Sequence, residues 1–397
     1  MKKMFMTAAV CLVCLSAMAQ AMTALWDAGQ LAEARKNIKE PKYAVALTRL
    51  LKAAEDELKS GDYSVMMKKK TAASGDKHDY LSQARYYWPD PTKPDGLPYI
   101  NRDGESNPEL NELDRIRLGA MADRMVNLTL AWYFTGKDEY AKGAVRQLRT
   151  WFIDKKTRMN PNLNYAQVVW GQNNNKGRKY GVLDGYSFVK MLDAVRLLGG
   201  SKAFKAADKK ALKAWFTEYM RWLLTAENAI EESQTENNHS TAYDSQLLAV
   251  ASYVGDRKVM ADILSGFTNR RLLPQIKEDG SQPRELARTL GFGYSQYNLT
   301  HILDIMQVAK AERIAVGGDT DEALRIVERA FDFLVPYLGK TVEAWPYKQI
   351  SGWDGKQVEL AYDCYRLYKL TGKQAYLDAF SKVKTDGSDL FTLLYVK

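Results

Sequence analysis

Apolar residues recur at helical spacing along most of the chain. Between Ile116 and Phe134 they fall at positions 116, 120, 121, 125, 128, 131 and 132, which places them on one face of a helix. Alternating strand patterns are rare, and residues 390–396 form the best strand-like run. The periodicity and its stop signals predict helices over 26–59, 116–134, 139–152, 184–198, 207–227, 239–253, 257–265, 297–314, 321–337, 357–370 and 374–383.

Short glycine turns separate neighbouring helices. Thr135-Gly136-Lys137 joins two of them, Thr371-Gly372-Lys373 repeats the pattern near the end, and Gly199 and Gly255 hold similar positions. Glycine after a helix accepts the left-handed conformation that ends it, and another helix then starts at once. Repeated pairs of this kind predict stacked helical hairpins, arranged either as an open solenoid or as a closed toroid. No linker divides the chain, so we expect one domain over residues 20–397.

The first residues have the organisation of a secretory signal peptide. Lys2 and Lys3 form a positive start, residues 8–15 are apolar but too short to span a membrane, and Ala17-Met18-Ala19 is a small-residue cleavage site. We therefore expect residues 1–19 to be removed near Ala19. The mature protein is then periplasmic or secreted, with no membrane insertion after cleavage.

The net charge of the chain narrows the class of partner that it can bind. The formal net charge is +9, and loss of Lys2 and Lys3 lowers it to +7. A basic exported protein favours a polyanionic partner, and export together with the lack of a nucleic-acid-binding motif argues against nucleic acid. An acidic polysaccharide fits better.

One cysteine, Cys364, remains after cleavage, which excludes an internal disulfide, so stability must come from a large core.

Two long segments do not fit a helical pattern. Residues 86–108 are rich in Pro, Gly and aromatic residues and include Trp88, and residues 159–181 are rich in Asn, Gly and aromatic residues and include Gln167 and Tyr180. Long loops inside a compact domain usually carry function. Aromatic rings beside amides and cations suit sugars, whose rings have apolar faces and hydroxyl edges. We take Trp88, Gln167 and Tyr180 as candidate substrate-binding residues.

The strongest chemical signal combines an amide, an imidazole, a guanidinium and a phenol. Asn237-Asn238-His239 is followed about fifty residues later by Arg288 and Tyr294. This set contains no carboxylate pair and no metal-ligand cluster. These side chains suit removal of a proton from a carbon beside a carboxylate. Negative charge then develops on that carboxylate, and it is stabilised by hydrogen bonds from the neutral Asn amide and from the two parallel N–H groups of the Arg guanidinium. The reaction that needs this chemistry is β-elimination in a uronic-acid polysaccharide.

His239 opens a predicted helix in which Tyr243 and Gln246 follow at i+4 and i+7, on the same face. The positive end of a helix favours a bound carboxylate and a neutral imidazole, which can act as a general base. Asn237 and Tyr243 are therefore added to the candidate binding residues.

Several passages together resemble the alginate-lyase family of polysaccharide lyases, nearest to polysaccharide lyase family 38. The resemblance covers roughly residues 85–340, with its motifs in the family's order. These motifs are Asn107-Pro108-Glu109, Trp151-Phe152, Thr157 to Leu163, Tyr165-Ala166-Gln167, Asn237-Asn238-His239, Asp279 to Thr289, Tyr294-Ser295 and Asn298-Leu299. The resemblance implies an all-α, single-domain (α/α) toroid of about six or seven helical hairpins, complete or incomplete, with a cleft across one end.

The resemblance also implies roles. Asn238 and Arg288 match the pair that neutralises the substrate carboxylate, His239 matches a neutraliser or base, and Tyr294 matches the tyrosine that protonates the leaving oxygen. The chain departs from the family pattern at Lys179-Tyr180, where relatives often carry Gly-Thr, so Tyr180 is a candidate added catalytic or binding residue. Tyr297 is a further candidate.

The choice of base depends on the sugar. In mannuronate the C5 proton is syn to the leaving oxygen, so one tyrosine can take the proton and also give one. In guluronate that proton is anti, so a base on the opposite face is needed, and His239 is the candidate. We expect mannuronate-containing alginate as substrate, with glucuronan as the alternative, and a 4,5-unsaturated uronate at the new non-reducing end. Endo or exo action and oligomeric state stay open.

The sequence is compatible with three alternatives to a polysaccharide lyase. A glycoside hydrolase on a toroid needs two spaced carboxylates, and no spacing selects a pair among Asp184, Asp244 and Glu285. A non-catalytic periplasmic polysaccharide-binding protein fits the aromatic loops and the charge. For a metal-dependent enzyme, the three histidines are widely spaced and form no ligand motif, so we expect no cofactor and no effect of chelators.

Overall fold

The computed structural model describes residues 23–385, 387 and 389–395, so the expected signal peptide and its cleavage site lie outside the described residues. The longer helices are α1 (Ala28–Lys36), α2 (Pro41–Lys59), α3 (Asp114–Thr135), α4 (Asp138–Leu148), α5 (Ser187–Leu198), α6 (Ala206–Thr225), α8 (Asn238–Val254), α9 (Arg257–Ser265), α12 (Gly291–Glu312), α13 (Thr320–Leu334) and α14 (Trp353–Thr371). The shorter helices are α7 (Glu227–Ser233), α10 (Leu273–Gln275), α11 (Pro283–Leu286), α15 (Gln374–Phe380) and α16 (Leu390–Leu394).

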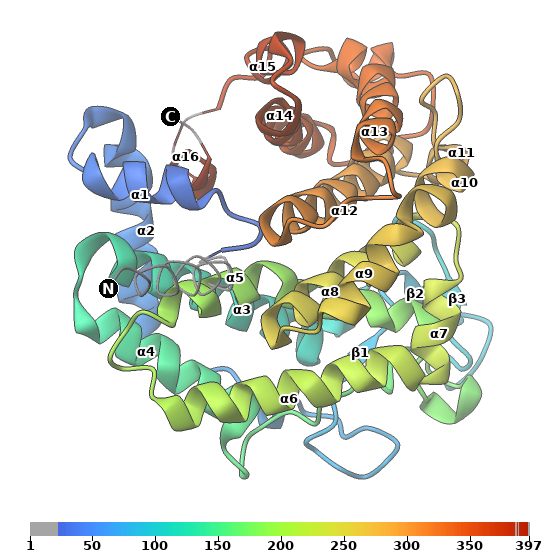
Figure 1. The fold of residues 1–397 in the computed structure, drawn as a ribbon. Coiled ribbons are helices and arrows are strands. Elements are labelled where there is room, and N and C mark those ends of the chain that lie inside the picture. Colours follow the sequence, from blue (N-terminus) through green and yellow to red (C-terminus); the bar gives the residue numbers. More distant parts are fainter. Residues whose placement is uncertain (1–22, 386, 388, 396–397) are drawn as a thin grey trace, which may run out of the picture.

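The helices follow one another around the molecule as an α/α toroid (Figure 1). Within the described chain, α1 and α2 lead into five further successive pairs, α3–α4, α5–α6, α8–α9, α12–α13 and α14–α15. One helix of each later pair packs on the next along the inside, in the order α3, α5, α8, α12 and α14. The C-terminal helix α16 packs against α1 and α2, so the first and last helices of the described chain lie side by side.

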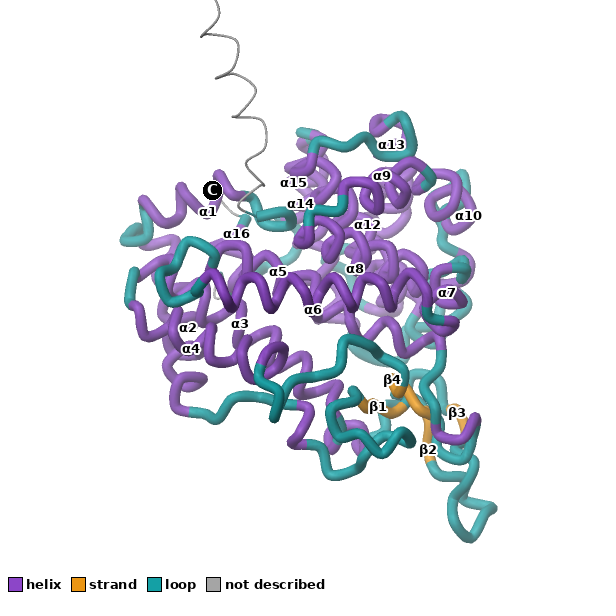
Figure 2. The backbone as a smooth tube through the Cα atoms, turned by 60° about the horizontal axis from the view of Figure 1, so that its bottom comes forward, coloured by secondary structure: helices purple, strands orange, loops and turns teal. Residues whose placement is uncertain are grey.

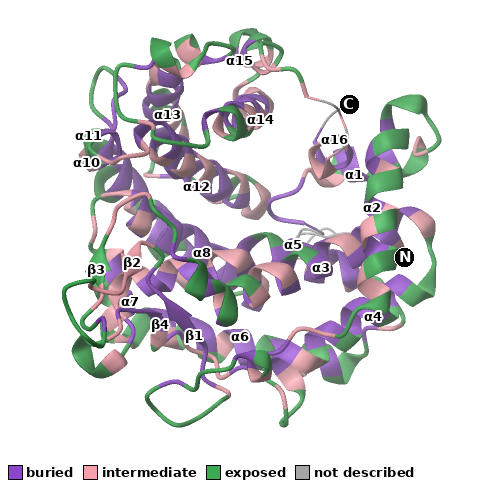
Figure 3. Cartoon of the chain, turned by 180° about the vertical axis from the view of Figure 1, so that it is seen from behind, coloured by how far each residue is buried: buried purple, intermediate pink, exposed green. Residues whose placement is uncertain are grey.

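Burial follows this arrangement. Nearly every residue of α8 and α12 is buried or half-buried, because both helices have neighbours on several sides (Figure 3). A large core joins buried residues from Ala24 to Tyr395, and Cys364 is buried within it as a free thiol. None of the helices in the described part of the chain is both long and apolar enough to cross a membrane.

Glycine ends three helices as predicted. Gly136, Gly255 and Gly372 take left-handed φ values of 72°, 81° and 72°, and each donates its N–H to the carbonyl four residues earlier. Gly199 is different, because its φ of −52° is right-handed and the turn continues through Gly200 with hydrogen bonds of the i to i−3 type. The prediction of a left-handed glycine was therefore wrong at Gly199.

Helix boundaries differ from the prediction at particular places. The predicted helix 26–59 is divided after Lys36, because Pro41 disfavours a helical conformation in the residue before it. Residues 390–394 form helix α16 and not a strand, because Asp389 caps its start by accepting from the N–H of Phe391 at 3.0 Å, and Leu393 is buried.

Four short strands gather at one end of the toroid (Figure 2). β1 (Leu81–Gln83) pairs in parallel with β4 (Tyr165–Val168), and β2 (Tyr87–Trp88) pairs with β3 (Ile100–Asn101) in an antiparallel hairpin. β2, β3 and β4 lie in the two long segments that did not fit a helical pattern, and β1 lies just before the first of these segments. They bring those segments together at the same end as the starts of several helices.

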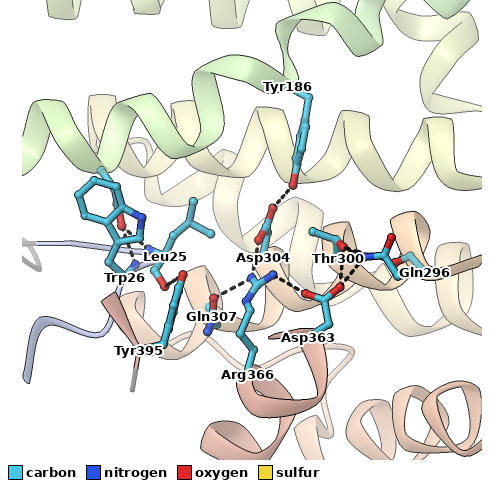
Figure 4. A network of polar contacts seen from close by, with 11 residues as sticks. Leu25, Trp26, Tyr186, Gln296, Thr300, Asp304, Gln307, Asp363, Arg366 and Tyr395 are labelled. Carbon is cyan, nitrogen blue, oxygen red and sulfur yellow. Dashed lines mark hydrogen bonds and ion pairs between the residues drawn. The ribbon is translucent and has the colours of Figure 1, made fainter. Parts of the chain in front are cut away.

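A buried ionic network joins the later helices to the rest of the ring (Figure 4). Arg366 on α14 donates to Asp304 of α12 at 2.5 Å and to Asp363 at 3.1 Å. Asp304 also accepts from the hydroxyl of Tyr186, and Asp363 accepts from Thr300 at 2.7 Å. One guanidinium therefore compensates two buried carboxylates at the junction between helices.

Replacing Arg366 by Met is expected to lower the free energy of unfolding by about 3–5 kcal/mol, because both aspartates would lose their buried counter-charge. The urea midpoint at neutral pH measures this change. Arg221→Met is the matched control: Arg221 pairs with Glu218 but has a 64% exposed side chain, against 8% for Arg366, so about 1 kcal/mol or less is expected there. Equal shifts in the two variants would contradict the assignment.

Candidate active site

A cleft of about 800 Å³ opens where the strands and helix starts meet. Its lining comes from the segment around β2 and β3, from residues 178–183, from the starts of α8 and α12, and from residues 349–356. Seven of the candidates chosen from the sequence line it, namely Gln167, Tyr180, Asn237, His239, Arg288, Tyr294 and Tyr297. Residues far apart in the chain thus share one solvent-accessible space.

Tyr294 and Arg288 form the centre of the cleft. Tyr294 lies in the first turn of α12, and Arg288 lies just before that helix. The guanidinium carbon is 4.2 Å from the centre of the Tyr294 ring, and Nη2 donates to the phenol oxygen at 3.2 Å. The hydroxyl of Tyr86 lies 2.8 Å from that of Tyr294. Burial, followed by the neighbouring Tyr86, raises the pKa of Tyr294, although Arg288 opposes this, so the phenol keeps its proton at neutral pH.

Arg288 already binds a carboxylate in this structure. Its Nη2 donates to Asp103 Oδ1 at 2.5 Å and its Nε donates to Oδ2 at 3.3 Å, which is the two-pronged geometry expected for a bound acid. Burial pushes the pKa of Asp103 upwards, but hydrogen bonds from Arg288 and Thr289 outweigh it, so the net shift is downwards. Asp103 therefore stays ionised and marks the position where Arg288 holds a carboxylate.

His239 is oriented by a buried acid. Its Nδ1 lies 2.6 Å from Oε1 of Glu232, whose side chain is fully buried. This contact engages Nδ1 of His239 and leaves Nε2 as the other ring nitrogen. The ring of Tyr180 meets the His239 ring edge-on, with centres 5.0 Å apart. The imidazole is thus held at the cleft in one orientation.

Asn238 lies behind the cleft. It is 1% exposed, and both its backbone N–H and its side-chain Nδ2 donate to Glu285 at 2.7 Å. Burial raises the pKa of Glu285, against the lowering effect of these bonds from Asn238. The contact ties the start of α8 to α11 and so sets His239 relative to Arg288. Direct contact between Asn238 and the substrate carboxylate stays a prediction.

Tyr243 and Trp88 lie outside the cleft lining. The Tyr243 hydroxyl donates to the carbonyl of Leu223 at 2.8 Å, and its ring lines a second hollow of about 490 Å³. The Trp88 indole donates to the carbonyl of Glu105 at 3.0 Å and supports Arg102. Because α8 is packed on several sides, the residues that follow His239 on the same helix face make internal contacts. The polar face expected from the sequence therefore reaches the cleft only at His239.

Gln167 and Tyr297 line the cleft but also serve internal contacts. Gln167 has a left-handed φ of 51°, and its Nε2 donates to buried Asp184 at 3.1 Å. Tyr297 packs against His301, with ring centres 4.2 Å apart. Burial raises the pKa of Tyr297. Both side chains therefore present fixed surfaces to the cleft.

Sequence reasoning missed Tyr86, Asp103, Glu232 and Arg178. Three of them lie in the aromatic and glycine-rich segments that were recognised as functional, so their region was visible but not their individual roles. Glu232 lies on the separate short helix α7, seven residues before His239, and no sequence pattern shows that the two side chains meet. Among the described residues, no group of three or more His, Cys, Asp or Glu side chains is placed to hold a metal ion.

Comparisons with known proteins find a matching family model and a similar crystal structure. The family model for alginate lyase matches residues 64–345. The crystal structure of an alginate lyase from Bacteroides ovatus is similar, with a TM-score of 0.91, 43% identity, and 94% of this chain and 99% of that chain covered.

More distant structures share the fold alone. Alginate lyase A1-III from Sphingomonas species A1 gives a TM-score of 0.52 at 16% identity, covering 90% of this chain and 99% of that chain. A histidine variant of A1-III complexed with a tetrasaccharide gives a TM-score of 0.53 at 15% identity, covering 92% and 98%. No curated protein sequence matches this chain.

Proposed function

This chain belongs to the alginate lyase family and is a polysaccharide lyase, and from that premise we propose that it cleaves mannuronate-containing alginate by β-elimination. The observation that carries the proposal is the contact of Arg288 with both a carboxylate and the Tyr294 hydroxyl. That contact places an acid-binding fork beside a proton-carrying phenol. The alginate lyase from Bacteroides ovatus, 43% identical, supports alginate as the polymer.

Neutralisation of the substrate acid is the first task. Removing the C5 proton adds negative charge to a group that is already an anion, so donors on the carboxylate stabilise the transition state. We assign this task to Arg288, with Asp103 leaving the guanidinium as the substrate carboxylate arrives. His239 lines the same cleft and provides a second donor or acceptor.

Proton transfer is the second task. Tyr294 keeps its proton at neutral pH because its pKa is raised, so it is suited to protonate the leaving glycosidic oxygen. With guluronate, Nε2 of His239 serves as the base on the opposite face. With mannuronate, Tyr294 gives its proton to the leaving oxygen and takes the C5 proton in the same step, so the phenol ends the reaction protonated, and the Tyr86 hydroxyl at 2.8 Å helps to hold its oxygen in place.

Ultraviolet absorbance tests the proposed function directly, because β-elimination leaves a conjugated double bond and hydrolysis does not. We expect the purified protein to release an absorbing 4,5-unsaturated product from polymannuronate. Polyguluronate, glucuronan and pectate are run in parallel. Product from glucuronan alone would replace alginate by the alternative polymer, and no absorbing product from any of the four would overturn the proposal.

The pH profile tests the acid role of Tyr294. A free phenol has a pKa of about 10, and this one is shifted upwards, so an acid at this position stays protonated throughout the neutral and mildly alkaline range. We expect kcat/KM on polyguluronate to stay level between about pH 8 and 10. A fall with an apparent pKa near 9 would contradict an acid role for Tyr294, and circular dichroism at each pH confirms that the protein is folded.

We also propose export to the periplasm or medium, on the basis of the signal-like residues 1–19, which are outside the described structure. N-terminal sequencing of protein recovered from the periplasm is expected to show a start close to Gln20. A start at Met1 would contradict export by this segment.

A further inference from the structure

The cations of the cleft are not all neutralised. Arg288 pairs with Asp103 at 2.5 Å, Arg115 approaches Asp184 at 3.7 Å, and Lys356 pairs with Glu359 at 2.5 Å. Arg178 also lines the cleft, yet it forms no ion pair with any carboxylate of the described chain. Its positive charge is therefore available to an anionic ligand.

Arg178 is held in one place by aromatic rings. Its guanidinium carbon lies 4.8 Å from the ring centre of Tyr87 and 4.9 Å from that of Tyr180, and Nη1 donates to the Tyr87 hydroxyl at 3.3 Å. Nε is enclosed and has no hydrogen-bond partner within the described residues. A guanidinium that is already ordered by stacking loses little conformational freedom when it binds a carboxylate, so the Arg178 guanidinium is preorganised for such binding.

The backbone beside Arg178 is equally constrained. Its N–H donates to the carbonyl of Ala166 at 3.2 Å. Gly181 lies so close to Ala166 that a Cβ on it would be 2.3 Å from that same carbonyl oxygen. These contacts fix the segment that carries Arg178 and Tyr180 against β4. The position of the guanidinium is thus a property of the folded chain and not of a loose loop.

Tyr180 separates Arg178 from the reaction centre. One neighbour of the Tyr180 ring is the Arg178 guanidinium, and another is the His239 imidazole at 5.0 Å. Arg178 is therefore displaced from His239 by one aromatic ring, while Arg288 serves the carboxylate beside Tyr294. A second carboxylate site in the same cleft is suited to a neighbouring sugar of the same polymer.

We propose that Arg178, clamped between Tyr87 and Tyr180, binds the carboxylate of a uronate next to the reacting one. The inference rests on the proposed function and deepens it, because it makes consecutive uronates the preferred substrate. Binding of the adjacent acid contributes to affinity in the ground state and the transition state alike, so it acts on KM more than on kcat.

The test compares Arg178→Met with the wild type on polymannuronate and on the same polymer after partial reduction of its carboxyl groups to alcohols. On polymannuronate we expect KM to rise about 10- to 100-fold with kcat changed less than about threefold, as for loss of a charge-assisted pair. On the reduced polymer the difference between the variant and the wild type narrows. Arg178→Lys, which keeps the charge without the fork, is expected to fall between them.

Arg35→Met is the matched control, because Arg35 also stacks on an aromatic ring, Tyr133 at 4.8 Å, but lies outside the cleft lining. It is expected to leave KM unchanged. If KM of folded Arg178→Met stays within about twofold of the wild type, or if only kcat falls, the inference is overturned.

Calorimetry measures polymer binding without turnover, so it tests the role of Arg178 independently of the proposed lyase activity. In a Tyr294→Phe background, which we expect to bind without turnover, adding Arg178→Met should weaken binding of polymannuronate fragments by the same 10- to 100-fold. Absence of an ultraviolet product from the wild type would overturn the proposed function. Unchanged binding in the double variant would overturn the role of Arg178 alone. Should Arg178→Met fail to fold, the KM of Arg178→Lys decides, and no rise in it would overturn the inference.

Discussion

Replacing Tyr294 by Phe is expected to lower kcat about 10²- to 10⁴-fold while leaving polymer binding nearly unchanged. The change removes one hydroxyl and keeps the ring that stacks on Arg288 at 4.2 Å. Without the phenol, no proton reaches the leaving glycosidic oxygen from this side of the cleft. Initial rates of ultraviolet absorbance on polymannuronate and polyguluronate measure the loss.

Tyr297→Phe is the control, since Tyr297 lies one turn further along α12 and lines the same cleft. We expect it to keep most of the activity, because its ring packs on His301 and its hydroxyl makes no contact with Arg288 among the described interactions. A large loss in Tyr297→Phe together with an active Tyr294→Phe would transfer the acid role to Tyr297.

His239→Ala separates the two polymers. If His239 is the base for guluronate only, this variant should lose activity on polyguluronate far more than on polymannuronate. Equal losses on both would mean that His239 acts on the carboxylate common to the two sugars, as a neutralising group.

Replacing Arg288 by Met is expected to lower kcat/KM about 10²- to 10³-fold, which corresponds to about 2.7–4 kcal/mol of transition-state stabilisation. Two effects combine in this variant. The substrate carboxylate loses its two-pronged donor, and Asp103 stays in the cleft as an uncompensated anion that repels the substrate. Steady-state kinetics on polymannuronate measures the change.

The double variant Arg288→Met with Asp103→Asn distinguishes these effects. Removing the Asp103 charge should recover part of the KM but little of the kcat, because the fork that stabilises the transition state is still missing. Full recovery in the double variant would show that Arg288 serves only to neutralise Asp103, and this would contradict its role toward the substrate.

Local sequence rules predicted much of the fold. Helix periodicity and the glycine ends at Gly136, Gly255 and Gly372 depend on residues within a few positions of one another, so they were readable without coordinates. The C-terminal segment was misjudged because an apolar run of seven residues fits a strand or a helix equally well. Packing of Leu393 into the core and capping by Asp389 favour the helix over the strand.

The candidate site was predicted only in part, for a similar reason. Motifs around His239, Arg288 and Tyr294 pointed to the chemistry, and the structure places all three at one cleft. Which of two adjacent asparagines faces that cleft depends on helix rotation. The structure turns Asn237 towards it and Asn238 towards Glu285.

By itself the sequence determined the helical pairs, the family and the kinds of side chain available for an elimination reaction, because these depend on local spacing and residue type. Only the tertiary structure decided that Asp103 occupies Arg288, that Glu232 orients His239, and that Arg178 is clamped beside Tyr180. Those contacts join segments that are distant or unpatterned in the chain, and only the packing of the helices and short strands sets the distance between them.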